Sequence, residues 1–181
     1  MKARGFARLR LRLIALTAAL MLLIAPAALA DITVNAADYP VTEGGWYDTR
    51  EEVAVYLTEF DTLPDNFLTK AEAEALGWHS SRGNLWQVAQ GMSIGGDRFG
   101  NYEKLLPEAK GRRWTECDIG FEGGYRGGER LVFSNDGLIY YTGDHYASFE
   151  QVIVVLDEPQ EPEEESLSLG SLLELIRWLM E

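Results

Sequence analysis

Cysteine is almost absent from this sequence of 181 residues, and its single copy is Cys117. One cysteine excludes an internal disulfide and a zinc site built from several thiolates. We expect Cys117 to be a small buried residue on a strand, because free cysteine is among the most buried residue types. The folded part of the chain must therefore be held together by a packed apolar core.

Positive charge is also scarce, with 16 Lys and Arg residues against 29 Asp and Glu residues. All 29 acidic residues but only 11 of the 16 basic ones lie in residues 31–181, which gives that part a formal net charge of −18. Nonspecific binding to nucleic acid depends on the neutralisation of phosphates. The charge balance thus excludes a protein that coats nucleic acid by bulk attraction, and any site for a polyanion must be local.

Residues 1–30 have the pattern of a secretory signal peptide. Five cations precede an apolar run over residues 13–23, and small residues at Ala28 and Ala30 suit a signal peptidase. A retained membrane anchor is the alternative, but the run is shorter than the roughly 20 residues that cross a bilayer. We therefore predict cleavage after Ala30 and a secreted, extracellular protein.

Helix signals precede strand signals along the rest of the chain. Residues 31–47 show no sustained period and are expected to form an irregular lead-in to a domain over residues 48–155. Capping boxes and helical spacing predict helices at residues 49–60, 69–77 and 85–89. Aromatic and β-branched segments between turn residues predict strands at residues 113–119, 130–133, 138–141 and 149–154. This order indicates an α+β fold in which N-terminal helices pack on a C-terminal antiparallel sheet.

One predicted strand and its neighbouring loops carry residues suited to phosphoryl chemistry. Alternation along the strands places Glu116 and Arg130 on one face of the sheet, Arg126 lies in a glycine-rich loop, and His145 follows the third strand. To cleave RNA without a metal, a base removes the ribose 2′-hydroxyl proton, an acid protonates the leaving oxygen, and cations hold the phosphate. Glu116 suits the base and His145 the acid, although spacing alone does not establish the pair.

Four stretches carry a resemblance to a known family: LPDNFLTKAEAEALGW at residues 63–78, SIGGDRFGN at 93–101, RRWTECDI at 112–119 and LIYYTGDHYASF at 138–149. Together they resemble the barnase-type family of extracellular guanyl-preferring microbial ribonucleases. The similarity spans nearly the whole predicted domain. It implies the microbial ribonuclease fold and a metal-independent endoribonuclease, without cofactor, that cleaves RNA after guanine. The product would first be a 2′,3′-cyclic phosphate, which is then hydrolysed to a 3′-phosphate.

The resemblance also implies roles for individual residues. The catalytic set consists of the general base, the general acid and the phosphate-binding cations: Glu116, His145, Lys70, Arg126 and Arg130. In the substrate-binding set, the backbone amides of the loop Phe99, Gly100 and Asn101 face guanine, and the Glu103 carboxylate accepts from the guanine nitrogens. Tyr146 lies beside the acid, and Asp97 braces the loop. Adenine would leave that charge and those amides unpaired. Two further expectations are that Asp118 orients Arg126 and that Arg112 and Asp136 form a structural ion pair.

Two features depart from the family. Tyr102 stands where barnase-type enzymes carry an arginine near the guanine site, which bears on base affinity and on recognition by an acidic, barstar-like protein inhibitor. The domain is also acidic, so we expect slower capture of RNA and a different salt dependence. We expect the protein to be a monomer. The alternative function is a catalytically weak binding module of this fold that has lost turnover. Retention of both an acid and a base argues against it, because a pure binder needs neither.

Residues 156–181 form an acidic, proline-containing segment followed by apolar residues with helical spacing at residues 171–180. This pattern is typical of an extended linker and a short final helix that is too short to cross a membrane. Three interpretations stay open. The tail is disordered, or its acids fold over Lys70, Arg126 and Arg130 as an RNA mimic, or its helix docks on an envelope component or a second chain.

Overall fold

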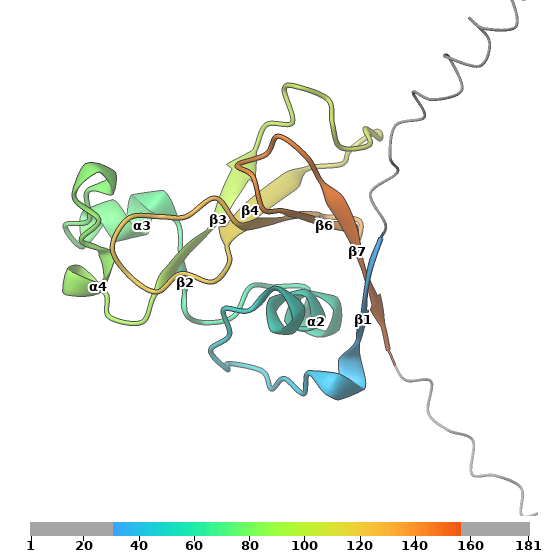
Figure 1. Ribbon diagram of the computed structural model, residues 1–181, viewed down its shortest axis with the longest axis horizontal. Coiled ribbons are helices and arrows are strands. Elements are labelled where there is room, and N and C mark those ends of the chain that lie inside the picture. The colour runs from blue at the N-terminus through green and yellow to red at the C-terminus, as the bar shows by residue number, and fades with distance from the viewer. Residues whose placement is uncertain (1–30, 157–181) are drawn as a thin grey trace, which may run out of the picture.

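The structure is a computed structural model that describes residues 31–156. The predicted signal peptide and the predicted final helix lie outside the described residues. A seven-stranded sheet runs through the described part in the order β1-β7-β6-β5-β4-β3-β2 (Figure 1). Its strands are β1 (Ile32–Asn35), β2 (Phe67–Leu68), β3 (Ser93–Phe99), β4 (Trp114–Asp118), β5 (Arg130–Ser134), β6 (Ile139–Thr142) and β7 (Glu150–Val155). The helical elements are η1 (Ala36–Asp38), α2 (Arg50–Phe60), α3 (Lys70–Ala75), η2 (Ser80–Arg82) and α4 (Leu85–Val88).

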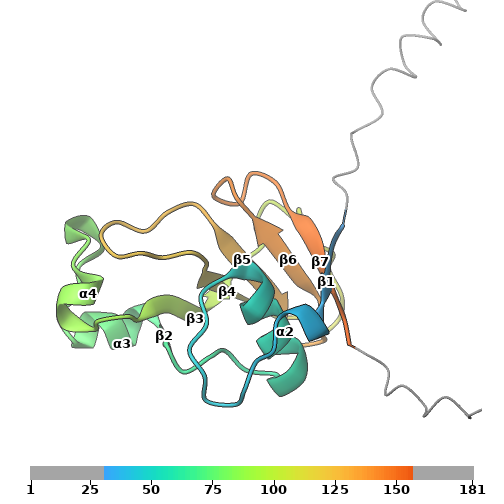
Figure 2. The ribbon, with the colours of Figure 1, turned by 60° about the horizontal axis from the view of Figure 1, so that its bottom comes forward.

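The predicted α+β class is confirmed, with a mixed sheet in place of a purely antiparallel one. Strands β3 to β7 pair antiparallel, whereas β1 and β2 add a parallel strand at each edge. Helix α2 covers one face of the sheet (Figure 2). The described residues contain no helix long and apolar enough to cross a membrane.

Helix α2 begins where the sequence predicts. The side chain of Thr49 accepts a hydrogen bond from the backbone N–H of Glu52, which satisfies one of the free donors of the first turn. Val53 and Leu57, one turn apart, are 0% and 7% exposed and belong to the cluster that includes Cys117 of β4. Cys117 is 1% exposed, and burial raises the pKa of its thiol. The single cysteine is therefore part of the core, as predicted.

Helix α2 ends on an acidic residue in a left-handed conformation. Asp61 has φ 54° and ψ 26°, and its backbone N–H donates to the carbonyl of Leu57. Glycine adopts this conformation without strain, and a negative charge at a helix C-terminus opposes the helix dipole. We expect Asp61→Gly to raise the free energy of unfolding by about 1 kcal/mol. Urea denaturation measures the change, with Glu43→Gln in an exposed loop as the control; an unchanged or lower stability for Asp61→Gly contradicts this interpretation.

The expectation of an irregular lead-in over residues 31–47 is wrong at its start. Ile32–Asn35 forms β1, which pairs parallel with β7 from Ile32 opposite Val152 to Asn35 opposite Val155. Val34 is 3% exposed and joins the main core cluster. A four-residue strand is too short to show a period, and its partner lies far along the chain. Only the tertiary pairing defines it.

A second apolar cluster lies at the opposite end of the sheet from β1, where Figure 1 shows α3 and α4 side by side. Helix α3 has a complete capping box between Thr69 and Glu72, and Gly77, with φ 98°, follows it. Trp78 and Leu85 are 3% and 0% exposed in this cluster. The capping box fixes the start of α3 beside β3 and so determines where its first residue, Lys70, lies.

Candidate active site

Glu116 lies in the middle of the sheet, on β4, opposite Val132 of β5. Glu116 is 7% exposed, and each oxygen of its carboxylate accepts one hydrogen bond. Lys70 Nζ lies 2.7 Å from Oε1, and the Tyr146 hydroxyl lies 2.8 Å from Oε2. A cation and a phenol thus hold one carboxylate at the junction of α3, β4 and the loop after β6.

Tyr146 remains a hydrogen-bond donor to Glu116 over the ordinary pH range. Burial, together with the hydrogen bond to the Glu116 carboxylate, raises the pKa of Tyr146 to about 12. Its ring packs against Phe99, with the ring centroids 5.2 Å apart. Tyr146 therefore links the carboxylate to the loop that follows β3.

Asp118, two residues beyond Glu116 on the same face, holds two arginines. Arg126 Nε and Nη2 each donate to one Asp118 oxygen at 2.6 Å. Burial by itself lowers the pKa of Arg126, but the hydrogen bond to Asp118 and the negative charges around the guanidinium together outweigh burial, so the pKa is raised. Arg130 is 2% exposed, with Nε 2.8 Å from Asp118 Oδ1 and Nη1 donating to the Glu129 carbonyl at 2.6 Å. The expected orientation of Arg126 by Asp118 is seen, and Arg130 lies deeper than the open sheet face that the alternation suggested.

The Arg130 guanidinium has donors to spare. Its Nε is buried and, despite its short distance to Asp118, makes no aligned hydrogen bond among the residues 31–156. Asp118 accepts its aligned bonds from Arg126. Two positive charges therefore share one negative charge, which leaves net positive charge beside Glu116 for an anion.

His145 lies in the loop after β6 and has an exposed side chain. Both His145 and Tyr146 have left-handed backbone conformations, with φ 61° and 71°. The His145 backbone N–H donates to the Gly128 carbonyl at 3.3 Å, and its ring centroid is 5.8 Å from that of Tyr146. The imidazole also lies close to Gly128, because its Nδ1 would be 3.8 Å from a Cβ atom added to that glycine. The imidazole thus lies between the glycine-rich loop that carries Arg126 and the side chain of Tyr146, which donates to Glu116.

The His145 loop is fixed by residues that sequence reasoning did not single out. Asp144 accepts from the backbone N–H groups of Ala147 and Ser148 at 2.9 Å each, and hydrogen bonds from Ser148 lower the pKa of Asp144 to about 2. Thr142, 1% exposed, accepts from the backbone N–H of Tyr146 at 2.9 Å. A threonine and an aspartate two residues apart before a histidine are a signal for such a turn.

The predicted guanine loop follows β3. Asn101, with φ 45°, donates to the Leu106 carbonyl at 2.9 Å and accepts from the Leu106 N–H at 3.0 Å, so its side chain closes the loop. Tyr102 is 89% exposed and its ring lies directly over Gly100, where any Cβ would collide with it. Glu103 is exposed, and no side-chain hydrogen bond or ion pair in the described part of the chain joins it to the Glu116 cluster.

Asp97 has a different contact from the one expected. Its Oδ2 accepts from the backbone N–H of Lys70 at 2.9 Å, which ties β3 to the first turn of α3. This hydrogen bond positions Lys70, and the bracing of the guanine loop by Asp97 stays a prediction. The predicted ion pair of Arg112 with Asp136 is present, with Arg112 Nη2 2.7 Å from Oδ2.

Comparison with known proteins places the arrangement in a family. The ribonuclease family matches residues 50–153, more than half of the chain. The chain belongs to the ribonuclease family. A ribonuclease of Heyndrickxia coagulans is 53% identical over 105 residues, which is 58% of this chain and 96% of that protein. A ribonuclease of Bacillus intermedius is also 53% identical over 105 residues, and the match covers 65% of its length. The barnase-type resemblance is thereby confirmed.

A solved structure, ribonuclease Sa2 with guanosine-2′-cyclophosphate, shares 33% identity over 32% of this chain and 62% of that one, with a TM-score of 0.29. An overlap of that size supports no statement about shared architecture. Strand β1 precedes the ribonuclease match, which begins at residue 50. Edge strand β1 of this ribonuclease therefore lies outside the residues that the family match covers.

Proposed function

We propose that this ribonuclease is an endonuclease that cleaves single-stranded RNA on the 3′ side of guanine. It forms a 2′,3′-cyclic phosphate by transesterification and then hydrolyses that product to a 3′-phosphate. The observation that carries the proposal is Glu116, buried in the sheet and held by Lys70 and Tyr146 beside the paired arginines, with the imidazole of His145 on the neighbouring loop. This is the set of groups that metal-independent cleavage of RNA requires.

In the first step Glu116 takes the proton of the ribose 2′-hydroxyl, whose oxygen attacks the phosphorus. Protonated His145 donates to the 5′-oxygen as its bond to phosphorus breaks. The roles reverse in the second step. Neutral His145 takes a proton from water, whose oxygen attacks the phosphorus, and Glu116 returns its proton to the 2′-oxygen as the bond between that oxygen and phosphorus breaks. The excess positive charge of Arg126, Arg130 and Lys70 stabilises the phosphate as its negative charge grows.

Selectivity for guanine comes from the loop after β3. Because the Asn101 side chain is occupied by Leu106, the loop has the backbone amides of Phe99 to Asn101 to offer to a base. Guanine presents an acceptor oxygen to these amides and donor nitrogens to the exposed Glu103 carboxylate. Adenine has an amino donor in place of that oxygen and no donor at N1 or C2, so it would leave the loop amides and the carboxylate unpaired in the complex.

Product analysis tests this proposal. The purified protein is incubated with an oligoribonucleotide that contains one guanine, with excess chelator present, and the ends of the fragments are identified over time. We expect a guanosine 2′,3′-cyclic phosphate that later becomes a 3′-phosphate. Fragments with 5′-phosphates, or cleavage that stops when chelator is added, would contradict it.

Tyr102 provides a test of the electrostatic part of the proposal. Tyr102→Arg adds a cation beside the guanine loop, and each phosphate neutralised on a single strand adds about −0.7 to the slope of log affinity against log salt. We expect the variant to have a higher kcat/KM at low salt and a salt slope steeper by about that amount. Tyr102→Phe keeps the ring without the charge and serves as the control. Equal slopes for the arginine variant and the wild type would count against the electrostatic account.

We propose further that the enzyme is secreted as a monomer after cleavage at Ala30. The supporting observations are the signal-like residues 1–30 and the place of Ile32, two residues beyond Ala30, in the sheet opposite Val152. Protein recovered from the medium should begin at Asp31 when its N-terminus is sequenced. An acidic, barstar-like inhibitor would face a site that has lost one arginine at Tyr102, so its binding should be strengthened by Tyr102→Arg.

A further inference from the structure

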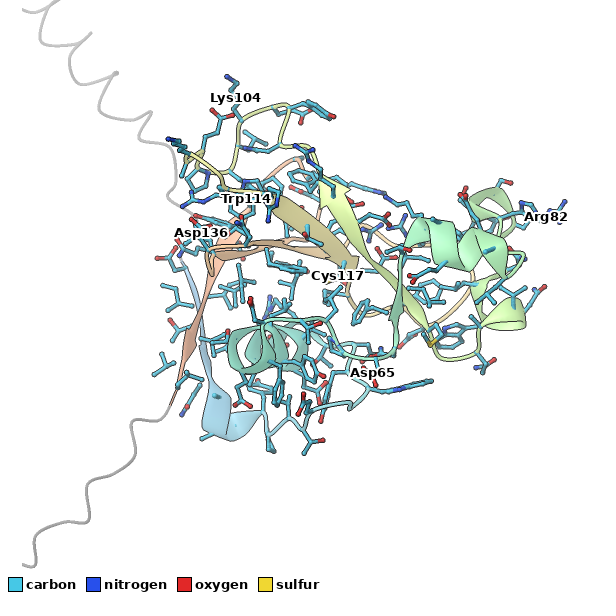
Figure 3. The ribbon with its side chains drawn as sticks, turned by 180° about the vertical axis from the view of Figure 1, so that it is seen from behind. Asp65, Arg82, Lys104, Trp114, Cys117 and Asp136 are labelled. Carbon is cyan, nitrogen blue, oxygen red and sulfur yellow. The ribbon has the colours of Figure 1, made fainter. Side chains whose placement is uncertain are left out.

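A hollow lies beside the guanine loop. It has a volume of about 490 Å³, and the loop residues Phe99, Gly100 and Asn101 form part of its lining. The remaining lining comes from Arg98 of β3, from Trp114 of β4 and from the segment between these strands, including Lys110. Figure 3 shows that segment rising above Trp114, with Lys104 at its tip. The hollow therefore adjoins the guanine loop without containing Glu116 or His145.

The hollow is positively charged within an acidic protein. Residues 98–113 contain five basic and two acidic residues, against the net charge of −13 for the chain. Arg98 and Lys110 are exposed, and no carboxylate among residues 31–156 lies within ion-pair distance of either. Arg112, which also lines the hollow, is neutralised by Asp136. With Glu108 counted as well, the lining keeps a net positive charge.

The lining favours a phosphate over a base. Trp114 is 5% exposed, and its ring packs against Tyr140 with the centroids 5.7 Å apart, so it forms a floor and offers no free face for stacking. The two cations without an ion-pair partner in the described part of the chain belong to long, exposed side chains, one on β3 and one on the loop before β4. Such cations neutralise phosphates without reading the base sequence.

We propose that this hollow is a phosphate-binding subsite for the RNA strand beyond the guanosine and its scissile phosphate, with Arg98 and Lys110 as its ligands. The inference rests on the proposed function, because the guanine loop is the wall that the two sites share. Because Phe99, Gly100 and Asn101 line the hollow together with Arg98 and Lys110, a base bound to the loop amides would bring the phosphate of a neighbouring nucleotide towards these cations. The subsite compensates locally for the repulsion that an acidic protein exerts on RNA.

The test compares substrates of different length in the full protein and in Arg98→Gln/Lys110→Gln. Substrates are a GpN dinucleotide and oligonucleotides that extend it by three nucleotides on the 5′ or the 3′ side. If each cation neutralises one phosphate, the two together contribute about −1.4 to the slope of log affinity against log salt. That slope corresponds to a roughly sevenfold fall in affinity between 50 and 200 mM salt. We expect the double variant to lose that salt dependence and about sevenfold in kcat/KM at the lower salt on one extended substrate, and to cleave the dinucleotide normally. The side that responds gives the direction of the strand.

Arg82→Gln is the matched control, because Arg82 is an exposed cation that lies at the opposite end of the molecule from Lys104 (Figure 3). Equal losses on the dinucleotide and the extended substrates, or no loss on either extended substrate, would overturn the subsite. Higher activity of the double variant on every substrate would also overturn it and would indicate that the acidic segment of this chain occupies the hollow. Binding of a 2′-deoxy oligonucleotide, measured by fluorescence anisotropy, reports on the subsite independently. If the wild type fails to cleave the dinucleotide, the proposed function fails, and anisotropy still decides the subsite.

Discussion

Replacement of Glu116 by Gln is expected to lower kcat/KM on a GpN dinucleotide by about three orders of magnitude. The amide fills the same space but cannot take the proton of the 2′-hydroxyl. Both reaction steps use this group, so hydrolysis of guanosine 2′,3′-cyclic phosphate should fall as well. Steady-state kinetics on the two substrates measures the two losses separately.

The Glu116 variant also decides between an enzyme and a binding module. Glu122→Gln, in an exposed loop, removes the same charge away from the cluster and should leave both rates unchanged. Glu116→Gln also removes the ion pair between Lys70 and residue 116. Because the Lys70 side chain is 40% exposed, water can solvate its charge, and the loss of the pair should cost little stability. If Glu116→Gln folds normally and keeps activity within tenfold of the wild type, Glu116 is not the base.

Replacement of His145 by Asn is expected to lower cleavage of GpN dinucleotides by two to four orders of magnitude, roughly the contribution of a general acid. Asparagine is the appropriate substitute because His145 has φ 61°, a conformation that asparagine tolerates. A guanosine 3′-phosphate ester with a nitrophenol leaving group needs no protonation to depart. On that substrate the same variant should lose far less in transesterification.

Comparison of the dinucleotide with the nitrophenyl ester shows whether His145 is a general acid or a residue that only shapes the site. His79→Asn is the matched control, since His79 is the other histidine of the chain and lies beside the second apolar cluster. Equal losses of the His145 variant on the nitrophenyl ester and the dinucleotide would contradict the role of His145 as the acid. Circular dichroism and thermal unfolding establish that the loop change leaves the fold intact.

Local sequence signals were sufficient for the three α-helices and for the strands that alternate, but not for the short helices η1 and η2. The capping residues Thr49 and Thr69 mark the starts of α2 and α3, and alternation correctly placed Glu116 and Asp118 on one face. Strand β3 gave no such signal, because its sequence SIGGDRF contains two glycines and two charges. A Cβ on Gly95 would lie 2.6 Å from that of Cys117, so this glycine is required by a tertiary contact that no local pattern reveals.

The identity of the site residues came from the resemblance, whereas their geometry required the structure. Nothing in the sequence indicates that Asp97 binds the backbone of Lys70, or that Thr142 holds the backbone of Tyr146. The left-handed conformations of His145 and Tyr146 are equally hard to predict from sequence, because residues other than glycine adopt them only in a small minority of cases. Such contacts join segments far apart in the chain or depend on a loop that closes only in the folded protein.

The central claim is that Glu116 and His145 act from opposite sides of one phosphodiester. A crystal structure with a dinucleotide that carries 2′-deoxyguanosine, and therefore lacks the attacking hydroxyl, tests it most directly. We predict the Glu116 carboxylate beside the 2′-carbon and the His145 imidazole at about 2.6–3.2 Å from the 5′-oxygen, with the phosphate between them against Arg126 and Arg130. A bound phosphate with both groups on one side, or with the imidazole out of reach of that oxygen, would contradict the mechanism.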